Sequence, residues 1–484
     1  MILIIQNGYE CKYELKLFAD LFFSDSEDVI IAQNFSYDNT EKKINAYTHI
    51  TFDGESYFED YFFDFDTFGK TDKLIKKIFT AACTKSLSHA ALKVRKTNFS
   101  WGVMCGIRPA KNVRELAEEG FSNEEIRDIF KNVYEVSAEK TELAMTVAEN
   151  EKALLKSIGE NSVSLYIGIP FCPTRCVYCS FVSTDIRVSG KYMAEFADKL
   201  LIEIDKTAET VNKIGAYVEN IYIGGGTPTT LDADTFKKIF ERLYSDFDLS
   251  HLKEFTVEAG RPDTITNEKL SVLKKYGVNR ISINPQTMND ETLKRIGRSH
   301  DSNMIRNAFL MAEKIGFDVI NADLIAGLPG ETPQMFEYSL NEVIKLCPEN
   351  ITVHSLCLKR AADFKMTDNK LAESETMNKM LSYTQRRMKE EGYEPYYMYR
   401  QKNSSGNLEN VGYAKKGTMS AYNVNIMEEK QTILAMGGGG STKLIIGDRI
   451  ERIFNFKDPL EYIRRFDEIL AKKDEILKIL SCGD

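Results

Sequence analysis

Several features are missing from this chain of 484 residues, and each absence excludes a class of protein. The formal net charge is −9 rather than positive, which argues against nucleic-acid binding as the main function. No apolar run is long enough to span a bilayer, and the apolar start, residues 1–6, lacks the basic segment of a signal peptide. We therefore interpret this start as a strand, and we expect a cytoplasmic protein without a membrane span.

Internal repeats and low-complexity segments are also lacking. Hydrophobic residues make up 43% of the chain and charged residues 28%, which is typical of a globular protein. A chain of this length is expected to form two or three domains. We predict an N-terminal α+β module with a helical bridge over residues 1–160, a central domain over 161–370 and a C-terminal extension over 371–484.

Local patterns predict the elements of the two outer parts. Residues 44–52 alternate in polarity and are followed by Asp53-Gly54, a strong hairpin signal. Helices are expected at 71–92, at 137–158 and after Ser122, where the sequence matches a capping box. The C-terminal part should contain a helix at 373–391, a strand at 432–436 and a helical tail at 458–480.

The central part alternates short β-branched runs with amphipathic helices, which indicates a parallel sheet. The six runs are residues 165–169, 221–223, 255–258, 280–284, 319–324 and 351–355. Six such units predict an α/β fold, a partial (β/α)6 barrel resembling a TIM barrel. The polar and glycine-rich clusters follow the strands, at the end where such folds place their sites.

The nine cysteines do not form a disulfide framework, because six are scattered and three fall within eight residues. Cys172, Cys176 and Cys179 have C-x3-C-x2-C spacing on a loop after a predicted strand. Three thiolates can bind three irons of a 4Fe-4S cluster and leave the fourth iron open to a ligand. The alternative is a zinc site, for which His300 or His354 would have to supply the fourth ligand.

This spacing, with Tyr178 before the last cysteine, resembles the cluster motif of the radical S-adenosylmethionine (SAM) superfamily. The flanking residues are similar to the oxygen-independent coproporphyrinogen III oxidase family, in particular its HemZ-type coproporphyrinogen dehydrogenase branch. The likeness extends over residues 164–443. It implies a radical SAM oxidoreductase with a 4Fe-4S cluster and S-adenosyl-L-methionine as cofactors, in which one-electron reduction of SAM yields a 5′-deoxyadenosyl radical.

The resemblance also implies site residues. Tyr166 matches a tyrosine beside the cluster and, with Arg298, is expected to be catalytic. The run Gly224-Gly225-Gly226-Thr227 resembles the family's SAM-binding motif, although a glycine run alone is also typical of a tight turn. Further SAM contacts are implied at Glu258, Gln286, Arg298 and Asp323, and backbone contacts to the adenine at Ile325 and near Cys357. Without the resemblance, each of these polar residues would be an ordinary strand-end side chain.

Substrate contacts and departures from the family pattern concern other positions. Arg400, Lys402 and the neighbouring tyrosines are either propionate and macrocycle contacts or a solvated loop with a packed aromatic cluster. The run from Gly437 to Gly440 is either a turn or a site element. The best-characterised oxidases have a fourth cysteine where this chain has Phe181 and a histidine where it has Gly168.

The leading hypothesis is oxidative decarboxylation of coproporphyrinogen III to protoporphyrinogen IX in haem (porphyrin) biosynthesis. A low-potential donor, flavodoxin or ferredoxin, would start the reaction. Two alternatives stay open, because fold resemblance does not decide substrate. One is a haem-binding chaperone of the same family, and the other is a radical SAM haem methyltransferase that degrades haem. All three predict a tetrapyrrole as the bound molecule.

Overall fold

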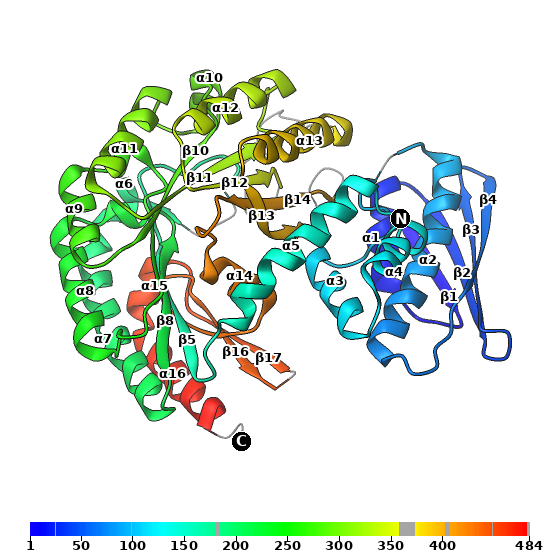
Figure 1. Ribbon diagram of the computed structural model, residues 1–484, viewed down its shortest axis with the longest axis horizontal. Helices are drawn as coiled ribbons and strands as arrows, with labels where there is room; N and C mark the ends of the chain where they lie inside the picture. The colour runs from blue at the N-terminus through cyan, green and yellow to red at the C-terminus, as the bar shows by residue number, and fades with distance from the viewer. Residues whose placement is uncertain are drawn as a thin grey trace. The chain divides into compact units, whose positions relative to one another are not determined.

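The computed structural model describes residues 1–24, 26–97, 99–179, 183–357, 373–401, 407–447 and 449–481. These residues form two compact units (Figure 1). The first unit consists of Met1–Ala148 together with Glu373–Asn378 and Met398–Glu409, and the second holds the remaining described residues. The first unit thus includes two segments from the region that the sequence assigns to the C-terminal extension.

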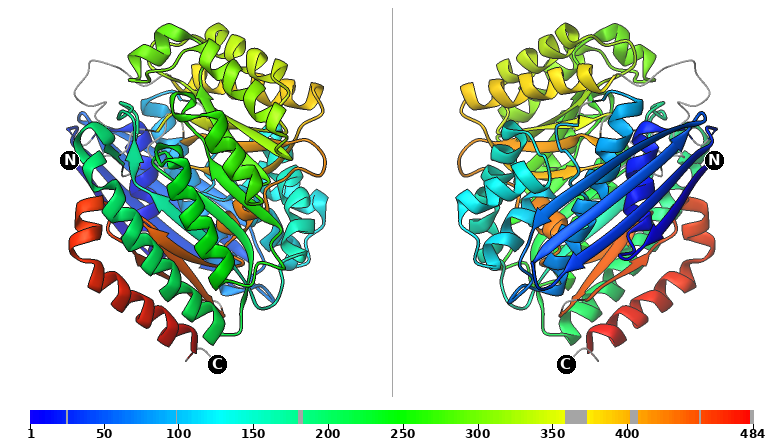
Figure 2. Two further views of the ribbon diagram at one scale, coloured as in Figure 1. Left: turned by 90° about the vertical axis from the view of Figure 1, so that its left-hand side faces the viewer. Right: turned by 90° about the vertical axis from the view of Figure 1, so that its right-hand side faces the viewer.

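A four-stranded sheet with two helices on one face makes up most of the first unit (Figure 2). Its strands, in sheet order, are β1 (Ile2–Asn7), β2 (Val29–Asp38), β3 (Lys43–Phe52) and β4 (Glu55–Asp64), and its helices are α1 (Lys12–Phe22) and α2 (Asp72–Val94). The predicted hairpin is confirmed, since Asp53 and Gly54 turn β3 into β4 with φ of 49° and 78°. The core lies between sheet and helices and contains Leu15, Ile31 and Leu87.

Further helices follow in the first unit: α3 (Pro109–Glu118), α4 (Asn123–Asp128), a π-helical turn (Ile129–Val133) and α5 (Ala138–Lys156), whose last residues belong to the second unit. The predicted capping box at Ser122 is present, because its side chain accepts from the backbone of Glu125 while the Glu125 side chain accepts from the backbone of Ser122. This exchange satisfies donors that a helix start would otherwise leave unpaired.

The six strands predicted for the central part are confirmed and form the middle of a parallel sheet. They are β5 (Ser162–Ile169), β8 (Tyr217–Gly225), β9 (Glu254–Glu258), β10 (Arg280–Gln286), β11 (Val319–Ala326) and β12 (Asn350–Ser355). Most of their residues are buried and the others are partly buried, as expected for a parallel sheet that is covered on both faces. The β-branched runs therefore mark these strands.

Helices on the outer side cover the sheet, which curves into the predicted partial barrel (Figure 1). They are α7 (Met193–Lys213), α8 (Ala233–Asp246), α9 (Asn267–Lys275), α11 (Ser302–Ile315) and α12 (Pro333–Lys345), with the short α10 (Asp290–Arg295) after β10. Their apolar faces pack on the strands, with Phe196, Phe236 and Phe336 among the largest buried side chains. This α/β architecture directs the carboxyl ends of the strands toward one rim.

The C-terminal region extends the sheet at both edges. Strand β15 (Thr432–Gly437) lies parallel to β5 and adds a seventh parallel strand, followed by the antiparallel β16 (Ser441–Ile446) and β17 (Arg449–Phe454). At the other edge, β14 (Glu409–Ala414) pairs antiparallel with β12 and is followed in the sheet by β13 (Glu394–Arg400). Helices α13 (Ser374–Glu390) and α14 (Ala421–Glu428) connect these strands.

A buried ion pair holds the last helices, α15 (Pro459–Arg464) and α16 (Phe466–Ser481), against α7. Lys473 Nζ lies 2.9 Å from Glu203 Oε1, and both side chains are almost fully buried. Glu203 Oε2 also accepts from Tyr462 Oη at 2.6 Å and from the Gly437 amide at 2.8 Å. The C-terminal helices are thereby tied to the end of β15.

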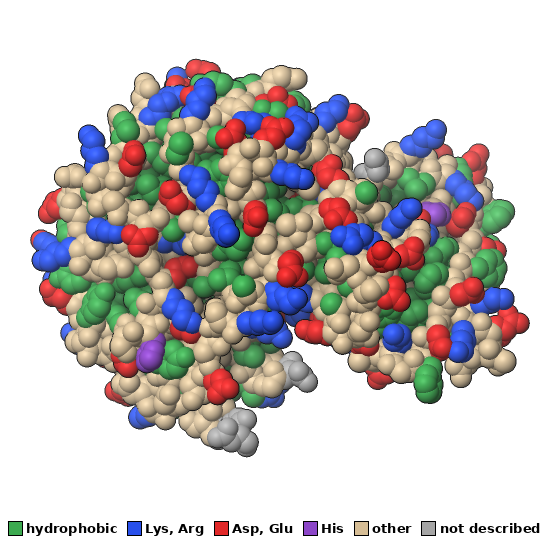
Figure 3. Space-filling model, in the orientation of Figure 1, with side chains coloured by type: hydrophobic (Ala, Val, Ile, Leu, Met, Phe, Trp, Pro, Cys, Tyr) green, Lys and Arg blue, Asp and Glu red, His purple; other side chains and the backbone are tan. Residues whose placement is uncertain are grey.

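The surface carries charges of both signs. Figure 3 shows Lys and Arg side chains interspersed with Asp and Glu over the face turned to the viewer. Within the described part of the chain, no helix has both the length and the apolar character needed to cross a membrane.

Candidate active site

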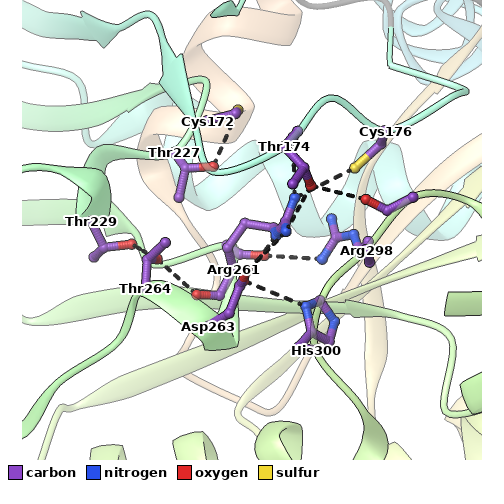
Figure 4. Close-up of polar contacts among 12 residues, drawn as sticks. Cys172, Thr174, Cys176, Thr227, Thr229, Arg261, Asp263, Thr264, Arg298 and His300 are labelled. Carbon is purple, nitrogen blue, oxygen red and sulfur yellow. Dashed lines mark hydrogen bonds and ion pairs between the residues drawn. The ribbon is translucent and has the colours of Figure 1, made fainter. Parts of the chain in front are cut away.

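The cysteine loop begins where β5 ends. A short strand, β6 (Phe171–Cys172), pairs in parallel with β7 (Thr184–Asp185), which is followed by the single-turn α6 (Ile186–Ser189). Cys176 and Cys179 are joined by a turn in which the Cys179 amide donates to the Cys176 carbonyl at 3.0 Å. Cys172 Sγ lies 3.3 Å from Thr227 Oγ1 (Figure 4). None of the three thiols is in a disulfide, and burial raises the pKa of Cys172.

This loop suits a cluster better than a single ion. Among the residues that the structure describes, no three His, Cys, Asp or Glu side chains gather closely enough to hold one metal ion. In a cubane each thiolate binds a different iron, so the sulfur atoms stand farther apart than zinc ligands do. The two histidines considered for zinc face carboxylates instead, His300 at 3.7 Å from Asp263 and His354 at 3.7 Å from Asp323.

The predicted glycine motif packs directly on the strand that leads into this loop. The Gly226 amide donates to the Ile169 carbonyl at 2.8 Å, and the Thr227 amide donates to the Phe171 carbonyl at 2.7 Å. A Cβ on Gly226 would lie only 2.6 Å from the Phe171 oxygen, so a side chain cannot be accommodated. Because these amides are used within the protein, a bound amine would have to meet backbone carbonyls of the motif.

The second glycine run lies on the other side of the same strand. Gly437 pairs with Gly168 across β15 and β5, and the Gly438 amide donates to the Gly168 carbonyl at 2.9 Å. A Cβ on Gly168 would lie 2.5 Å from the Gly438 oxygen. A larger residue at position 168 would therefore collide with this run as the two strands are paired here. The run is a turn that packs beside the cysteine loop.

Glu258 ends β9 and points toward tyrosines of the barrel interior. Tyr222 Oη donates to Glu258 Oε1 at 2.6 Å, and a Cβ on Gly224 would lie 3.0 Å from the same oxygen. Burial raises the pKa of Glu258 to about 7, and the charge of Asp323 acts in the same direction. The ring of Tyr222 stacks between Tyr166 and Tyr422, with centroid distances of 6.2 and 4.6 Å.

Arg298 connects the cysteine loop with the ends of β9 and β10. Its Nη1 donates to the carbonyls of Gly260 at 3.2 Å and Asn284 at 2.7 Å, and its Nη2 donates to Tyr178 Oη at 3.2 Å. Its Nε is buried and has no hydrogen-bond partner within the described residues. An unused buried donor on a fixed guanidinium fits an incoming carboxylate such as that of SAM's methionine.

The other predicted SAM contacts lie at neighbouring strand ends. Gln286 is 7% exposed and has φ of 68°, a backbone conformation that is uncommon for a residue other than glycine. Asp323 accepts from Asn321 Nδ2 at 2.8 Å and lies inside β11, which runs two residues beyond its predicted end. Ile325 and Cys357 are buried. Their roles toward SAM stay predictions.

Several residues of this region were not anticipated from the sequence. Arg261 and Asp263 lie just beyond Glu258, the last residue of β9, and this position after a strand end is a signal that could have found them. Tyr222 precedes Gly224 by two positions in β8, so strand alternation places both on one face. Tyr422 comes from α14, and nothing in its local sequence indicates that it meets the barrel interior.

Arg400, considered for substrate binding, is packed inside the first unit. Its Nη1 donates to the Met104 carbonyl at 2.8 Å, its Nε donates to the Asn407 carbonyl at 3.0 Å, and it lies 5.5 Å from the Trp101 ring centroid. Burial lowers the pKa of Arg400 to about 10. The structure thus supports the packed interpretation of Arg400. Phe181 and Lys402 lie outside the described residues.

Comparison with known proteins first defines the class. Residues 166–343 match the family model of the radical SAM superfamily. The solved structure of coproporphyrinogen III oxidase (HemN) from Escherichia coli, a radical SAM enzyme, superposes with a TM-score of 0.52 at 25% identity, over 66% of this chain and 72% of that one. The fold and the cysteine loop are those of a radical SAM protein.

Curated relatives then define the family. The oxygen-independent coproporphyrinogen-III oxidase-like protein HemZ of Bacillus subtilis (strain 168) is 42% identical over 387 residues, which is 78% of this chain and 77% of that protein. The heme chaperone HemW of the same organism is 33% identical over 275 residues, 55% of this chain and 68% of that protein. The chain belongs to the family of HemZ-type oxygen-independent coproporphyrinogen-III oxidase-like proteins. Members of this family are expected to bind an iron–sulfur cluster and SAM.

Proposed function

We propose that this chain is an oxidoreductase that converts coproporphyrinogen III to protoporphyrinogen IX without oxygen, using a 4Fe-4S cluster and SAM. The observation that carries the proposal is the 42% identity to HemZ over most of both chains, together with an intact cysteine loop. The relative of known structure is itself a coproporphyrinogen III oxidase. The cytoplasmic location stays a prediction.

Different residues at the rim of the barrel would bind the cluster and SAM. Cys172, Cys176 and Cys179 would hold the cluster. Arg298 would use its unpaired Nε for the methionine carboxylate, and Glu258 would accept from the methionine amine. When bound, the cluster and SAM supply a one-electron reduction and the 5′-deoxyadenosyl radical that abstracts hydrogen.

The reaction balances as follows for each of two propionate side chains. One hydrogen atom leaves the β-carbon and ends on 5′-deoxyadenosine, one CO2 is lost, and one electron passes to an external one-electron acceptor, which leaves a vinyl group. A flavodoxin- or ferredoxin-type donor would supply the one electron that the cleavage of each SAM requires. The half-buried Tyr166 and Tyr222 line the interior beside Glu258 and would keep water from the reacting carbon.

The similarity to HemW favours a second candidate. Because that relative is a heme chaperone and matches 55% of this chain at 33% identity, the same scaffold would also serve to bind haem and pass it on. A chaperone needs tight haem binding but no turnover of a porphyrinogen.

Anaerobic turnover distinguishes the two. The chain is loaded with iron and sulfide and incubated with coproporphyrinogen III, SAM and dithionite, and tetrapyrroles and deoxyadenosine are measured by mass spectrometry. We expect about four irons per chain and divinyl product. Cys176→Ser should abolish both, whereas Cys347→Ser, at an exposed cysteine, should change neither. Deoxyadenosine without vinyl product would refute the proposed substrate, and haem binding without SAM cleavage would favour the chaperone.

A further inference from the structure

Arg261 packs against the cysteine loop and was not among the predicted site residues. It follows β9 and immediately precedes a 3-10 turn, Pro262–Thr264. Its side chain is only 3% exposed, although a guanidinium is costly to bury unless its donors are satisfied. The groups that accept hydrogen bonds from Arg261 therefore indicate its role.

Its donors reach the segment between the first two cysteines (Figure 4). Nη1 lies 3.8 Å from Cys176 Sγ and 3.3 Å from the Thr174 carbonyl, and Nη2 lies 3.1 Å from Thr174 Oγ1. Thr174 Oγ1 in turn donates to the Gly297 carbonyl at 2.9 Å. One guanidinium thus fixes the backbone, a hydroxyl and a thiol of the loop at once.

A carboxylate on the far side balances this charge. Arg261 Nε donates to Asp263 Oδ1 at 3.0 Å, and Nη2 donates to Asp263 Oδ2 at 2.9 Å. The nitrogen that faces Cys176 is not one of these two. His300 Nδ1 lies 3.7 Å from Asp263 Oδ1, on a buried ring whose pKa is lowered by burial. The positive end of the Arg261–Asp263 pair therefore points at the thiol.

The electrostatic consequence concerns electron uptake. A thiolate-bound cluster becomes more negative by one charge when it is reduced, so a nearby cation and a hydrogen bond to a ligand sulfur favour the reduced form. Groups around the ligands also fix their orientation. A carboxylate in the same surroundings acts in the opposite direction, because its charge repels the incoming electron.

We propose that Arg261 is a positioning residue that orients Cys176 and raises the reduction potential of the cluster, and that Asp263 limits this effect. The inference rests on the cluster assignment under the proposed function but not on the identity of the tetrapyrrole. The electron comes from the flavodoxin- or ferredoxin-type donor, which is oxidised by one electron, and no bond or proton of the protein changes.

The test uses the full chain, loaded anaerobically with iron and sulfide, without SAM or substrate. The midpoint potential is measured by titration with dithionite and redox mediators, followed by electron paramagnetic resonance, and iron and sulfide are counted in parallel. The variants are Arg261→Gln, Arg261→Lys and Asp263→Asn. The control is Arg242→Gln, because Arg242 pairs with Asp205 at 3.0 Å and is 42% exposed.

We expect Arg261→Gln to shift the midpoint potential to more negative values and Asp263→Asn to shift it to more positive values. Arg261→Lys should restore most of the potential because it keeps the charge, and the control should match the wild type. If the Arg261→Gln variant takes up no cluster, the midpoint potential of Asp263→Asn tests the inference instead, because this variant leaves the contacts between Arg261 and the loop in place. Unshifted potentials, or shifts of the same sign for Arg261→Gln and Asp263→Asn, would overturn this inference but leave the proposed function standing. A wild-type chain without iron would overturn the proposed function as well.

Discussion

Replacing Glu258 by glutamine should make the protein more stable at neutral pH while it impairs SAM binding. Glutamine keeps the oxygen that accepts from Tyr222 Oη at 2.6 Å, so the packing is retained. What the substitution removes is a carboxyl group that the fold prefers in its protonated form. Functional groups held in an unfavourable state commonly lower stability in this way.

The magnitude follows from the pKa of Glu258, which burial raises from 4.5 to about 7. A raised carboxyl pKa contributes stability below the unfolded-state value and loses it as the pH rises to the folded-state value. At about 1.4 kcal/mol per unit, the cost above pH 7 is at most about 3 kcal/mol, and about 2 kcal/mol of it should appear between pH 5 and pH 8. The partial exposure of the side chain reduces this figure.

The assay compares urea unfolding of wild type and Glu258→Gln at pH 5 and pH 8, without SAM. Circular dichroism is the appropriate signal, because the one tryptophan, Trp101, belongs to the first unit and reports on that unit. The stability difference in favour of the variant should grow with pH, whereas Glu268→Gln, at an exposed position of α9, should show no such growth. A difference that is equal at both pH values would refute the reasoning.

In calorimetry, wild-type affinity for SAM should rise from pH 6 to pH 8, since the ionised carboxylate of Glu258 binds the amine of SAM.

Three further outcomes are expected. Gly437→Ala should lower iron content and melting temperature, because its φ is 79° and the new Cβ would lie 2.2 Å from a carbonyl oxygen of β5, whereas Gly439→Ala meets nothing within 4 Å and should cost only about 1 kcal/mol. Lys473→Met should destabilise the second unit by about 3–5 kcal/mol in denaturant titration, since it leaves the buried charge of Glu203 unpaired; a change below 1 kcal/mol would contradict this. Arg298→Lys should weaken SAM binding about tenfold or more in calorimetry at unchanged iron content, because a lysine cannot reproduce the forked donation, and unchanged affinity would argue against its role.

Local sequence determined the elements and the cysteine loop. The six β-branched runs became β5 and β8–β12, and Asp53-Gly54 became a hairpin turn, because strand alternation and turn preferences act between near neighbours. The three cysteines could be grouped for the same reason, since they fall within eight residues. Glu258 and Gln286 were predicted as SAM contacts from the family resemblance, and the fold adds that both end parallel strands that meet at one rim.

Tertiary structure decided what depends on contacts between distant segments. The pairing of β15 with β5 places Gly437 against Gly168, 269 positions earlier, and no local pattern encodes that neighbour. Arg400 follows a tyrosine-rich run that suits a substrate surface equally well, and only the packing on Trp101 shows that its donors are used within the protein. The charge that faces Cys176 was likewise settled by the fold, because Arg261 reaches the loop through space from the end of another strand.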